Sequence, residues 1–142
     1  MSFDIKVENG DIVFSSLGEI QTVSGLDKLK QDVAKVLLTE IGANVYHPWY
    51  GSELTDSVIG GIADVSLTTQ NAESTINEAL ENLAALQMQQ RSQQNVTPQE
   101  TIGAIKEIKV TREPSDPRLW TVSVTVLSRS LSEITEEFNI AF

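Results

Sequence analysis

Apolar and polar side chains alternate along the N-terminal segment. Phe3, Ile5 and Val7 are separated by charged residues, which is the period of a half-buried strand. Asn9-Gly10 supplies the two residues of positive φ that a two-residue hairpin turn requires. We therefore expect a small β-hairpin here, followed by a second turn at Leu17-Gly18 and a short strand over residues 20–23.

The next segment has the period of a helix. Ser24 is suited to cap its N-terminus, with Asp27 as the acidic partner of a capping box. Gly42 suits the left-handed conformation that ends many helices. The apolar residues between them fall at steps of three and four and form one face: Leu26, Leu29, Val33, Val36, Leu37 and Ile41. The pattern predicts a helix over residues 24–42.

A short helix is predicted after an aromatic loop, at about Glu53–Ile59. Ser52 is placed to cap it, and Gly60-Gly61 would end it.

A longer helix is predicted from Ser66 or Thr68. Its apolar face consists of Ala72, Ile76, Ala79, Leu80, Leu83 and Leu86. The following stretch, QMQQRSQQN, can continue the helix because its residues are good helix formers, but we expect it to be solvated and to lack a core face. The sequence TPQE at residues 97–100 is a further capping signature and predicts one more helical turn.

The C-terminal part has the period of β-strands. Ile108 and Val110 alternate with charged residues. In the next strand, one face carries Trp120, Val122, Val124 and Val126, and the other carries Thr121, Ser123 and Thr125. The last strand alternates Ile134, Phe138, Ile140 and Phe142, with Glu136 interrupting the row. We expect this last strand to lie at an edge of the sheet.

The order of these elements predicts an α+β fold: an N-terminal β-hairpin, two to three central helices, and C-terminal antiparallel strands in a small sheet. We expect a single domain over residues 1–142. Within it, residues 1–23 form the hairpin region, residues 24–103 the helical part and residues 104–142 the β part.

The net charge of −10 changes which partners are expected. A nucleic-acid groove needs a basic stripe, so we expect no nucleic-acid partner. The N-terminus lacks the features of a signal peptide, and no apolar run reaches the ~18 residues of a membrane span, so no membrane association is expected. There is no cysteine, which excludes disulfides and cysteine-based metal sites or nucleophiles.

Candidate catalytic groups are few. Glu40, Glu53 and Asp56 flank the aromatic loop and invite comparison with a glycosidase acid pair. A role at helix ends accounts for these acids better, because acidic groups favour a helix N-terminus. His47 is the only histidine, and no second histidine or Gly-x-Ser-x-Gly motif accompanies it. We therefore predict no enzymatic activity, no metal and no cofactor.

Aromatic residues give the loop a possible binding role. Tyr46, Trp49 and Tyr50 either fill the core between two helices or present an anchor to a protein partner, since Tyr and Trp dominate interface hot spots. The strands Leu119–Leu127 and Glu133–Phe142 likewise either close one core or offer an edge to a strand of another chain.

Residues 11–60 resemble the baseplate wedge family of contractile phage tails, the gp25-like sheath initiators. The recognisable core of this family is a helix that ends in a Leu-Leu-Thr type of sequence. Gly, Pro, an aromatic residue, Gly-Ser and Leu come after it in that order. Here these are Leu37-Leu38-Thr39, Gly42, Pro48, Tyr50, Gly51-Ser52 and Leu54. The rest of the chain is similar to the family in the order of its elements.

The resemblance implies a structural role in the virion, after assembly in the host cytoplasm. About six copies would form a ring, dock on baseplate wedge proteins and, in some devices, contact tube or hub proteins. They would start sheath assembly by exchanging a β-strand with the tail sheath protein. On this basis the expected contact residues are Tyr46, Trp49, Tyr50, Trp120, Val122, Val124, Phe138, Ile140 and Phe142.

The chain departs from the family at one motif. Many members carry Glu-Pro-Arg between the long helix and the next strand, where it is associated with docking on the wedge core. This chain has no such sequence there; Arg112-Glu113-Pro114 comes later and in a different order. Two other functions stay open at this stage: a tail-associated, lysozyme-like glycan hydrolase, and a small soluble regulator of the same fold.

Overall fold

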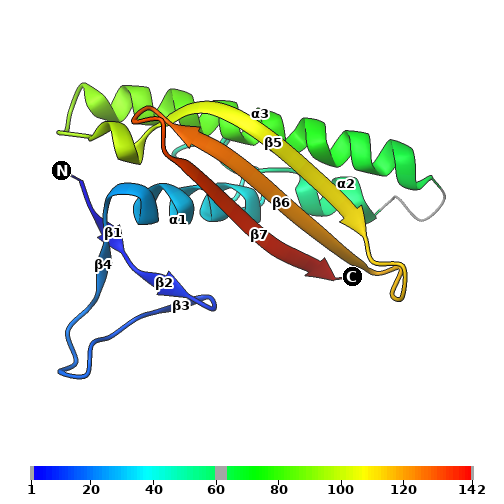
Figure 1. Ribbon diagram of the computed structural model, residues 1–142, viewed down its shortest axis with the longest axis horizontal. Helices are drawn as coiled ribbons and strands as arrows, with labels where there is room; N and C mark the ends of the chain where they lie inside the picture. The colour runs from blue at the N-terminus through cyan, green and yellow to red at the C-terminus, as the bar shows by residue number, and fades with distance from the viewer. Residues whose placement is uncertain (1, 60–63, 142) are drawn as a thin grey trace.

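The structure is a computed structural model that describes residues 2–59 and 64–141. Figure 1 shows the order of its elements. The N-terminal strands are β1 (Asp4–Ile5), β2 (Val7–Glu8), β3 (Asp11–Ile12) and β4 (Thr22–Val23). The helices are α1 (Gly25–Leu38), α2 (Leu54–Ile59), α3 (Val65–Arg91) and the 3₁₀ turn η1 (Pro98–Glu100). The C-terminal strands are β5 (Ile102–Arg112), β6 (Leu119–Ser128) and β7 (Glu133–Ala141).

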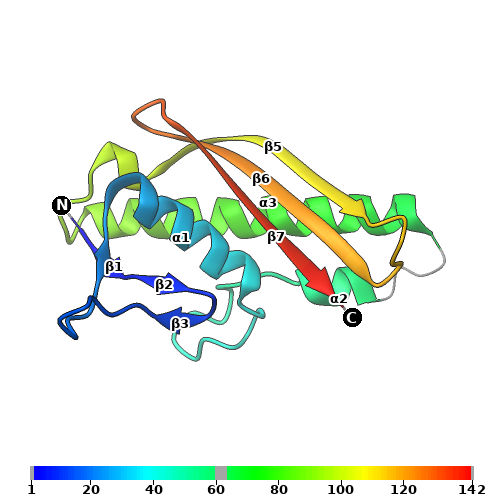
Figure 2. The same cartoon turned by 60° about the horizontal axis from the view of Figure 1, so that its bottom comes forward.

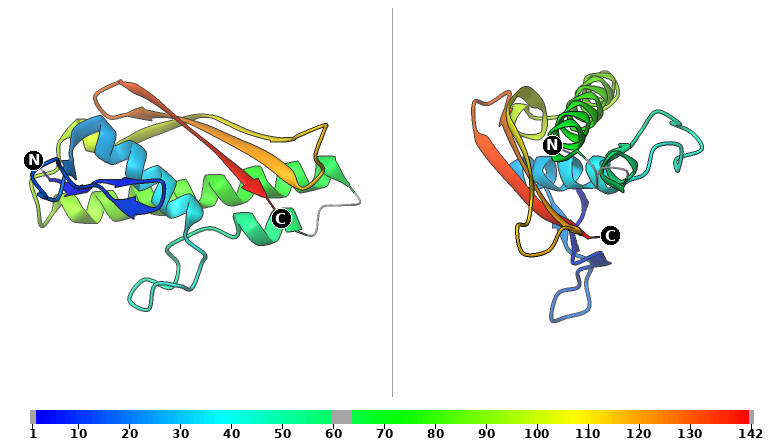
Figure 3. Two further views of the ribbon diagram at one scale, coloured as in Figure 1. Left: turned by 90° about the horizontal axis from the view of Figure 1, so that it is seen from below. Right: turned by 90° about the vertical axis from the view of Figure 1, so that its right-hand side faces the viewer.

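The body of the protein is a three-stranded antiparallel sheet with the order β5-β6-β7. The helices lie on one face of this sheet, as the views in Figures 1 and 3 agree. Side chains from that face, from α1, α2 and α3 make a single core. The α+β prediction is therefore confirmed, including the antiparallel sheet at the C-terminal end.

Strand β6 is central because its apolar row meets the helices. Trp120, Val122, Val124 and Val126 are all buried, as their two-residue spacing predicts for one face of a strand. In the opposite row Thr121 and Ser123 are half-buried, whereas Thr125 is buried. One face of the sheet thus packs on the core, and the other faces solvent.

Helix α3 begins earlier and has more core contact than the sequence suggested. Its N-cap is Asp64, whose carboxylate accepts a hydrogen bond from the Leu67 N–H at 3.1 Å. The helix continues through the glutamine-rich stretch, as predicted, but the expectation of a fully solvated end was wrong. Gln87 is buried there: its amide donates to the Glu100 carbonyl at 3.1 Å and accepts from the Ile102 N–H at 2.9 Å. These two bonds fix η1 and the start of β5 against α3.

Helix α1 is shorter than predicted at its C-terminal end. It ends at Leu38, and Thr39 is extended, because Glu40 pairs with Ser52 across a parallel bridge and the Ser52 N–H donates to the Thr39 carbonyl at 2.9 Å. A Cβ at Gly51 would lie 2.7 Å from that carbonyl oxygen, so this crossing requires glycine. Gly42 does have positive φ, but it lies in the loop and not at the helix end.

The predicted capping groups have mixed outcomes. Ser24 occupies the N-cap position of α1, but its side chain makes no capping hydrogen bond. The Ser52 hydroxyl accepts from the Leu54 N–H at 3.4 Å and donates to the Leu37 carbonyl at 2.7 Å, so it links α2 to α1. The predicted end of the short helix at Gly60-Gly61 lies outside the described residues.

The predicted helical turn at residues 97–100 is present as η1. The carboxylate of Glu100 is fully buried and accepts hydrogen bonds from the Thr97 N–H and the Ser2 hydroxyl, both at 2.9 Å. Burial alone would raise the pKa of Glu100, but these donors and the nearby Lys28 charge lower it. The N-terminus of the chain is thereby tied to the turn that precedes the sheet.

Residues 3–23 form a separate feature, which we call the arm. Asn9 and Gly10 have φ values of 51° and 80°, so the predicted hairpin turn is confirmed, and Gly18 marks the second turn with a φ of 80°. Strand β1 pairs with β4, and β2 pairs with β3. The arm projects from the body beneath α1 (Figure 2).

The expectation of a half-buried strand in the arm was wrong. Its large apolar side chains are exposed: Phe3, Ile5, Val7, Ile12, Phe14, Leu17 and Ile20. The physical reason is that each strand is two residues long and the polar row is the one turned to α1. Asp4 bonds to Gln31 and Lys35 of that helix and is half-buried, so the alternate, apolar row is left exposed. In the part of the chain that the structure describes, no helix combines the length and apolar character of a membrane span.

Candidate functional site

Strand β7 forms one edge of the sheet, as the sequence predicted. It pairs with β6 from Leu119↔Ala141 to Leu127↔Glu133. Over residues 2–59 and 64–141, no strand pairs with its other side. Because a strand presents a backbone N–H and C=O group on each side in alternation, this free side can accept hydrogen bonds from another extended chain.

The side chains of β7 divide into two rows. Ile134, Phe138 and Ile140 face the core side and are only half-buried. Glu136 lies in the same row, with its carboxylate 3.7 Å from the Lys30 ammonium. Burial raises the pKa of Glu136, and the Lys30 charge offsets this only in part. A charged side chain in the core-facing row of an edge strand is a known device against uncontrolled strand pairing.

Three residues predicted to contact a partner are in the core instead. Trp120, Val122 and Val124 are buried, and both sides of β6 are occupied by β5 and β7. Their side chains stabilise the body and do not form a surface that a partner can reach. Phe138 and Ile140 lie on the edge strand, whereas Phe142 lies outside the described residues.

A groove lies between β7 and the arm, and we call it the edge groove. Its volume is about 550 Å³. Glu136 lines the β7 side, Lys30 and Ala34 of α1 lie between, and Val7 and Val23 are among the residues on the arm side. Sequence patterns gave no sign of this groove, because it joins segments more than a hundred residues apart.

The arm is held to α1 by one polar side chain. The Gln31 amide oxygen accepts from the Val7 N–H at 2.9 Å, and its nitrogen donates to the Ile5 carbonyl at 2.8 Å and to the Asp4 carboxylate at 3.1 Å. Gln31 thus bonds the backbone groups of Ile5 and Val7 that a neighbouring strand would otherwise pair with. The helical pattern alone gave no signal for this role of Gln31.

Charged groups reinforce this attachment. Lys35 bonds to Asp4 and lies 3.2 Å from Asp32, and Lys28 donates to Asp32 at 2.7 Å. Burial opposes the charge of Asp4, but the Lys35 ammonium and the donors of Ile5 and Gln31 lower the pKa of Asp4. Burial also opposes the charge of Lys35, but Asp4 and Asp32 raise the pKa of Lys35. Both groups therefore stay ionised across neutral pH.

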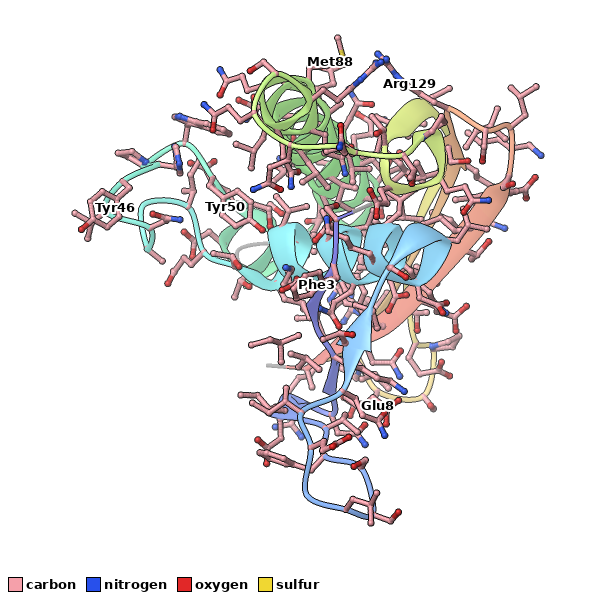
Figure 4. The ribbon with its side chains drawn as sticks, turned by 90° about the vertical axis from the view of Figure 1, so that its left-hand side faces the viewer. Phe3, Glu8, Tyr46, Tyr50, Met88 and Arg129 are labelled. Atoms are coloured by element: carbon pink, nitrogen blue, oxygen red, sulfur yellow. The ribbon has the colours of Figure 1, made fainter. Side chains whose placement is uncertain are left out.

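The aromatic loop combines the two alternatives that the sequence left open. Tyr50 packs against the core near the base of the loop, and burial raises the pKa of its hydroxyl. Tyr46 is 89% exposed and points away from the body (Figure 4). Trp49 is exposed and meets the His47 ring edge-on, with the ring centroids 5.4 Å apart. Tyr46 and Trp49 are accessible to a partner, while Tyr50 fixes the loop.

A hollow of about 670 Å³ lies between α1, α3 and this loop. Phe3, His47 and Tyr50 line it together with glutamines of α3. Its carboxylates, Asp4 and Asp32, are already paired with lysines. Glu40, Glu53 and Asp56 are exposed and do not line this hollow. Among the described residues, no group of three or more His, Cys, Asp or Glu side chains could hold a metal ion.

Comparison with known proteins gives a structural likeness. No protein-family model matches the chain, and no curated protein does. A solved structure from Geobacter sulfurreducens, described as a candidate tail lysozyme, is similar with a TM-score of 0.60. The match covers 93% of this chain and 96% of that chain at 15% sequence identity. At that identity the likeness establishes a shared fold over nearly the full length of both chains.

Proposed function

We propose that this chain is a structural component of the baseplate of a contractile phage tail, or of a related injection device. In this role it docks on wedge proteins and starts sheath assembly by accepting a β-strand from the first ring of sheath subunits. The observation that carries the proposal is the free side of β7, a nine-residue edge strand. A full-length likeness to a protein described as belonging to a tail supports it, as does the sequence resemblance.

The physical basis is β-augmentation. An added strand pairs its backbone with β7, which gives affinity without sequence-specific contacts, and alternate side chains then give specificity. The half-buried row of Ile134, Phe138 and Ile140 would lose its remaining exposed apolar area on pairing, which favours the complex. Tyr46 and Trp49 offer a separate surface for a wedge protein.

Removal of β7 tests the strand-exchange step. With Glu133–Phe142 deleted, we expect particles that contain wedges but lack sheath. Normal sheath on such particles would refute the proposal. Because the deletion also uncovers core residues, amide hydrogen exchange of the intact chain, free and within isolated baseplates, provides a second measurement. Exchange along β7 should slow in the baseplate; unchanged exchange would likewise refute the proposal.

A glycan hydrolase is the second candidate, because the structural neighbour is described as a lysozyme. Such an enzyme needs a carboxyl group with a raised pKa as its general acid. The pKa of Asp4, in the hollow of about 670 Å³, is lowered by its ion pair, which is the opposite of that requirement. The pKa of Glu136 is raised, but its carboxylate pairs with Lys30. Clearing of a cell-wall suspension by the intact chain, lost in Glu40→Gln, Glu53→Gln or Asp56→Asn, would favour the hydrolase. Absence of clearing by the intact chain would exclude the hydrolase function.

A further inference from the structure

We propose that the arm is the second wall of the strand-binding site. The free side of β7, the adjoining surface of α1 and the arm would together receive one extended segment of a partner chain. This inference rests on the proposed function in one respect, namely that β7 accepts a strand. It adds that the segment is held on two sides, and that the arm exists to make the second contact.

The position of the edge groove supports two-sided contact. A strand added to a sheet lies about 4.8 Å from its neighbour, with every second side chain pointing to the same face. On the core-facing side of β7, those side chains would enter the edge groove, which Glu136 lines from β7 and Val7 and Val23 line from the arm. The arm is therefore within reach of the added strand without rearrangement.

Two apolar residues of the arm contribute to the same groove. Val7 is exposed and Val23 is half-buried, and both line the edge groove; exposed apolar surface in a groove is typical of an interaction site. The Gln31 hydrogen bonds and the Lys35–Asp4 ion pair hold this apolar segment against α1, beside the free edge. A segment that only filled space would not need this polar attachment. Figure 4 shows Glu8 of the arm on the side toward the sheet.

The lining of the groove defines the chemistry of the occupant. Val7, Val23 and Ala34 form the apolar part of the lining and favour short apolar side chains. Of the charged residues that line the groove, Lys6 pairs with Glu8 at 2.8 Å and Lys30 with Glu136 at 3.7 Å, whereas Asp27 has no ion pair within the described residues. On the outer face of β7, Glu137 has no ion pair within the described residues. Opposite charges on neighbouring strands attract. The expected partner segment therefore alternates small apolar residues with polar residues that include lysine or arginine.

A tethered strand tests this arrangement in the full chain. A flexible linker of about six residues after Phe142 would carry a nine-residue strand that alternates valine with threonine and lysine, matching the length of β7. Tethering raises the effective concentration to the millimolar range, so weak pairing is still observed. The control carries the same residues in an order without alternation. Amide hydrogen exchange is measured along β7 and along the arm.

We expect the alternating strand to slow exchange about tenfold both in β7 and around Val7, Thr22 and Val23 of the arm. Slowing confined to β7 would overturn the two-sided site and leave the proposed function intact. No slowing at β7 would overturn both. Equal slowing by the control strand would also overturn the inference, because the inference requires the alternating pattern of side chains for the contact.

Two substitutions in the arm locate the contact. Val7→Ser should reduce the slowing in the arm by at least threefold, because Val7 lines the edge groove. Leu17→Ser should leave it unchanged, because Leu17 is 85% exposed and does not line the groove. An equal response of the two variants would contradict the proposed geometry. Circular dichroism of both variants checks that the fold is retained.

Discussion

The body and the arm contain the same alternation of apolar and polar residues but bury it differently. In β6, Trp120, Val122 and Val124 alternate with polar residues and are buried, since three helices cover that face of the sheet. In the arm, Phe3, Ile5 and Val7 follow the same period and remain exposed. Alternation thus encodes an extended conformation, whereas burial depends on whether another layer is present. Where no layer covers the row, its apolar surface is available for a partner.

The largest effect is expected from a substitution in the body. Trp120→Ala should lower the free energy of unfolding by about 3–5 kcal/mol, because a 3% exposed aromatic side chain is replaced by a cavity. Urea unfolding measures this change. On the solvent side of the same strand, Ser123→Ala should change it by less than about 0.5 kcal/mol. Similar losses for the two variants would show that the two faces of β6 are not distinguished as described.

The next effect concerns a polar group in the body. Gln87→Ala removes the amide that pairs with the Glu100 carbonyl and the Ile102 N–H, so two buried backbone groups lose their partners. We expect a loss of about 2–3 kcal/mol in the free energy of unfolding. Gln89→Ala, at an exposed position of the same helix, should be nearly neutral. An equally neutral Gln87→Ala would mean that water replaces the lost bonds.

A smaller effect is expected on the stability of the attachment between the arm and the body, and it depends on pH. The folded pKa of Asp4 lies below its ordinary value of 3.8, so its contribution is present above that pH and is lost as pH falls through the folded pKa. The raised pKa of Lys35 places the loss of its contribution above 10.5. Between these limits the arm stays attached; below about pH 4 the protection of its amides, measured relative to the intrinsic exchange rate at each pH, should fall while that of the body amides does not.

Asp4→Asn separates this ion pair from general acid effects. Asp4 and Lys35 are partly exposed, so the variant should cost at most about 1 kcal/mol at neutral pH. It should also remove the acid-induced loss of amide protection in the arm. If the variant lost amide protection in the arm at the same low pH as the original chain, carboxylates other than Asp4 would be responsible.

The sequence specified most of the body and little of the contact between body and arm. The buried row of β6 and the turn at Asn9-Gly10 follow from short-range patterns, because period and turn chemistry are local properties. The end of α1 was missed, since it depends on pairing between Glu40 and Ser52 across the loop. Gln31 and Gln87 were missed for a related reason: each bonds backbone groups that are distant along the chain. The edge groove was missed for the same reason, because segments that are distant along the chain form it.

The smallest effect on stability is expected at the arm itself, and it completes the comparison with Trp120. Phe14 is an aromatic residue in an alternating segment, yet it is 57% exposed, so Phe14→Ala removes little buried area and leaves no cavity. We expect the free energy of unfolding to change by less than about 0.5 kcal/mol in urea. A loss near that of Trp120→Ala would mean that the arm packs against the body in solution, and its apolar residues would then belong to the core. A neutral result leaves those residues with no role in stability, and contact with a partner would then account for their presence.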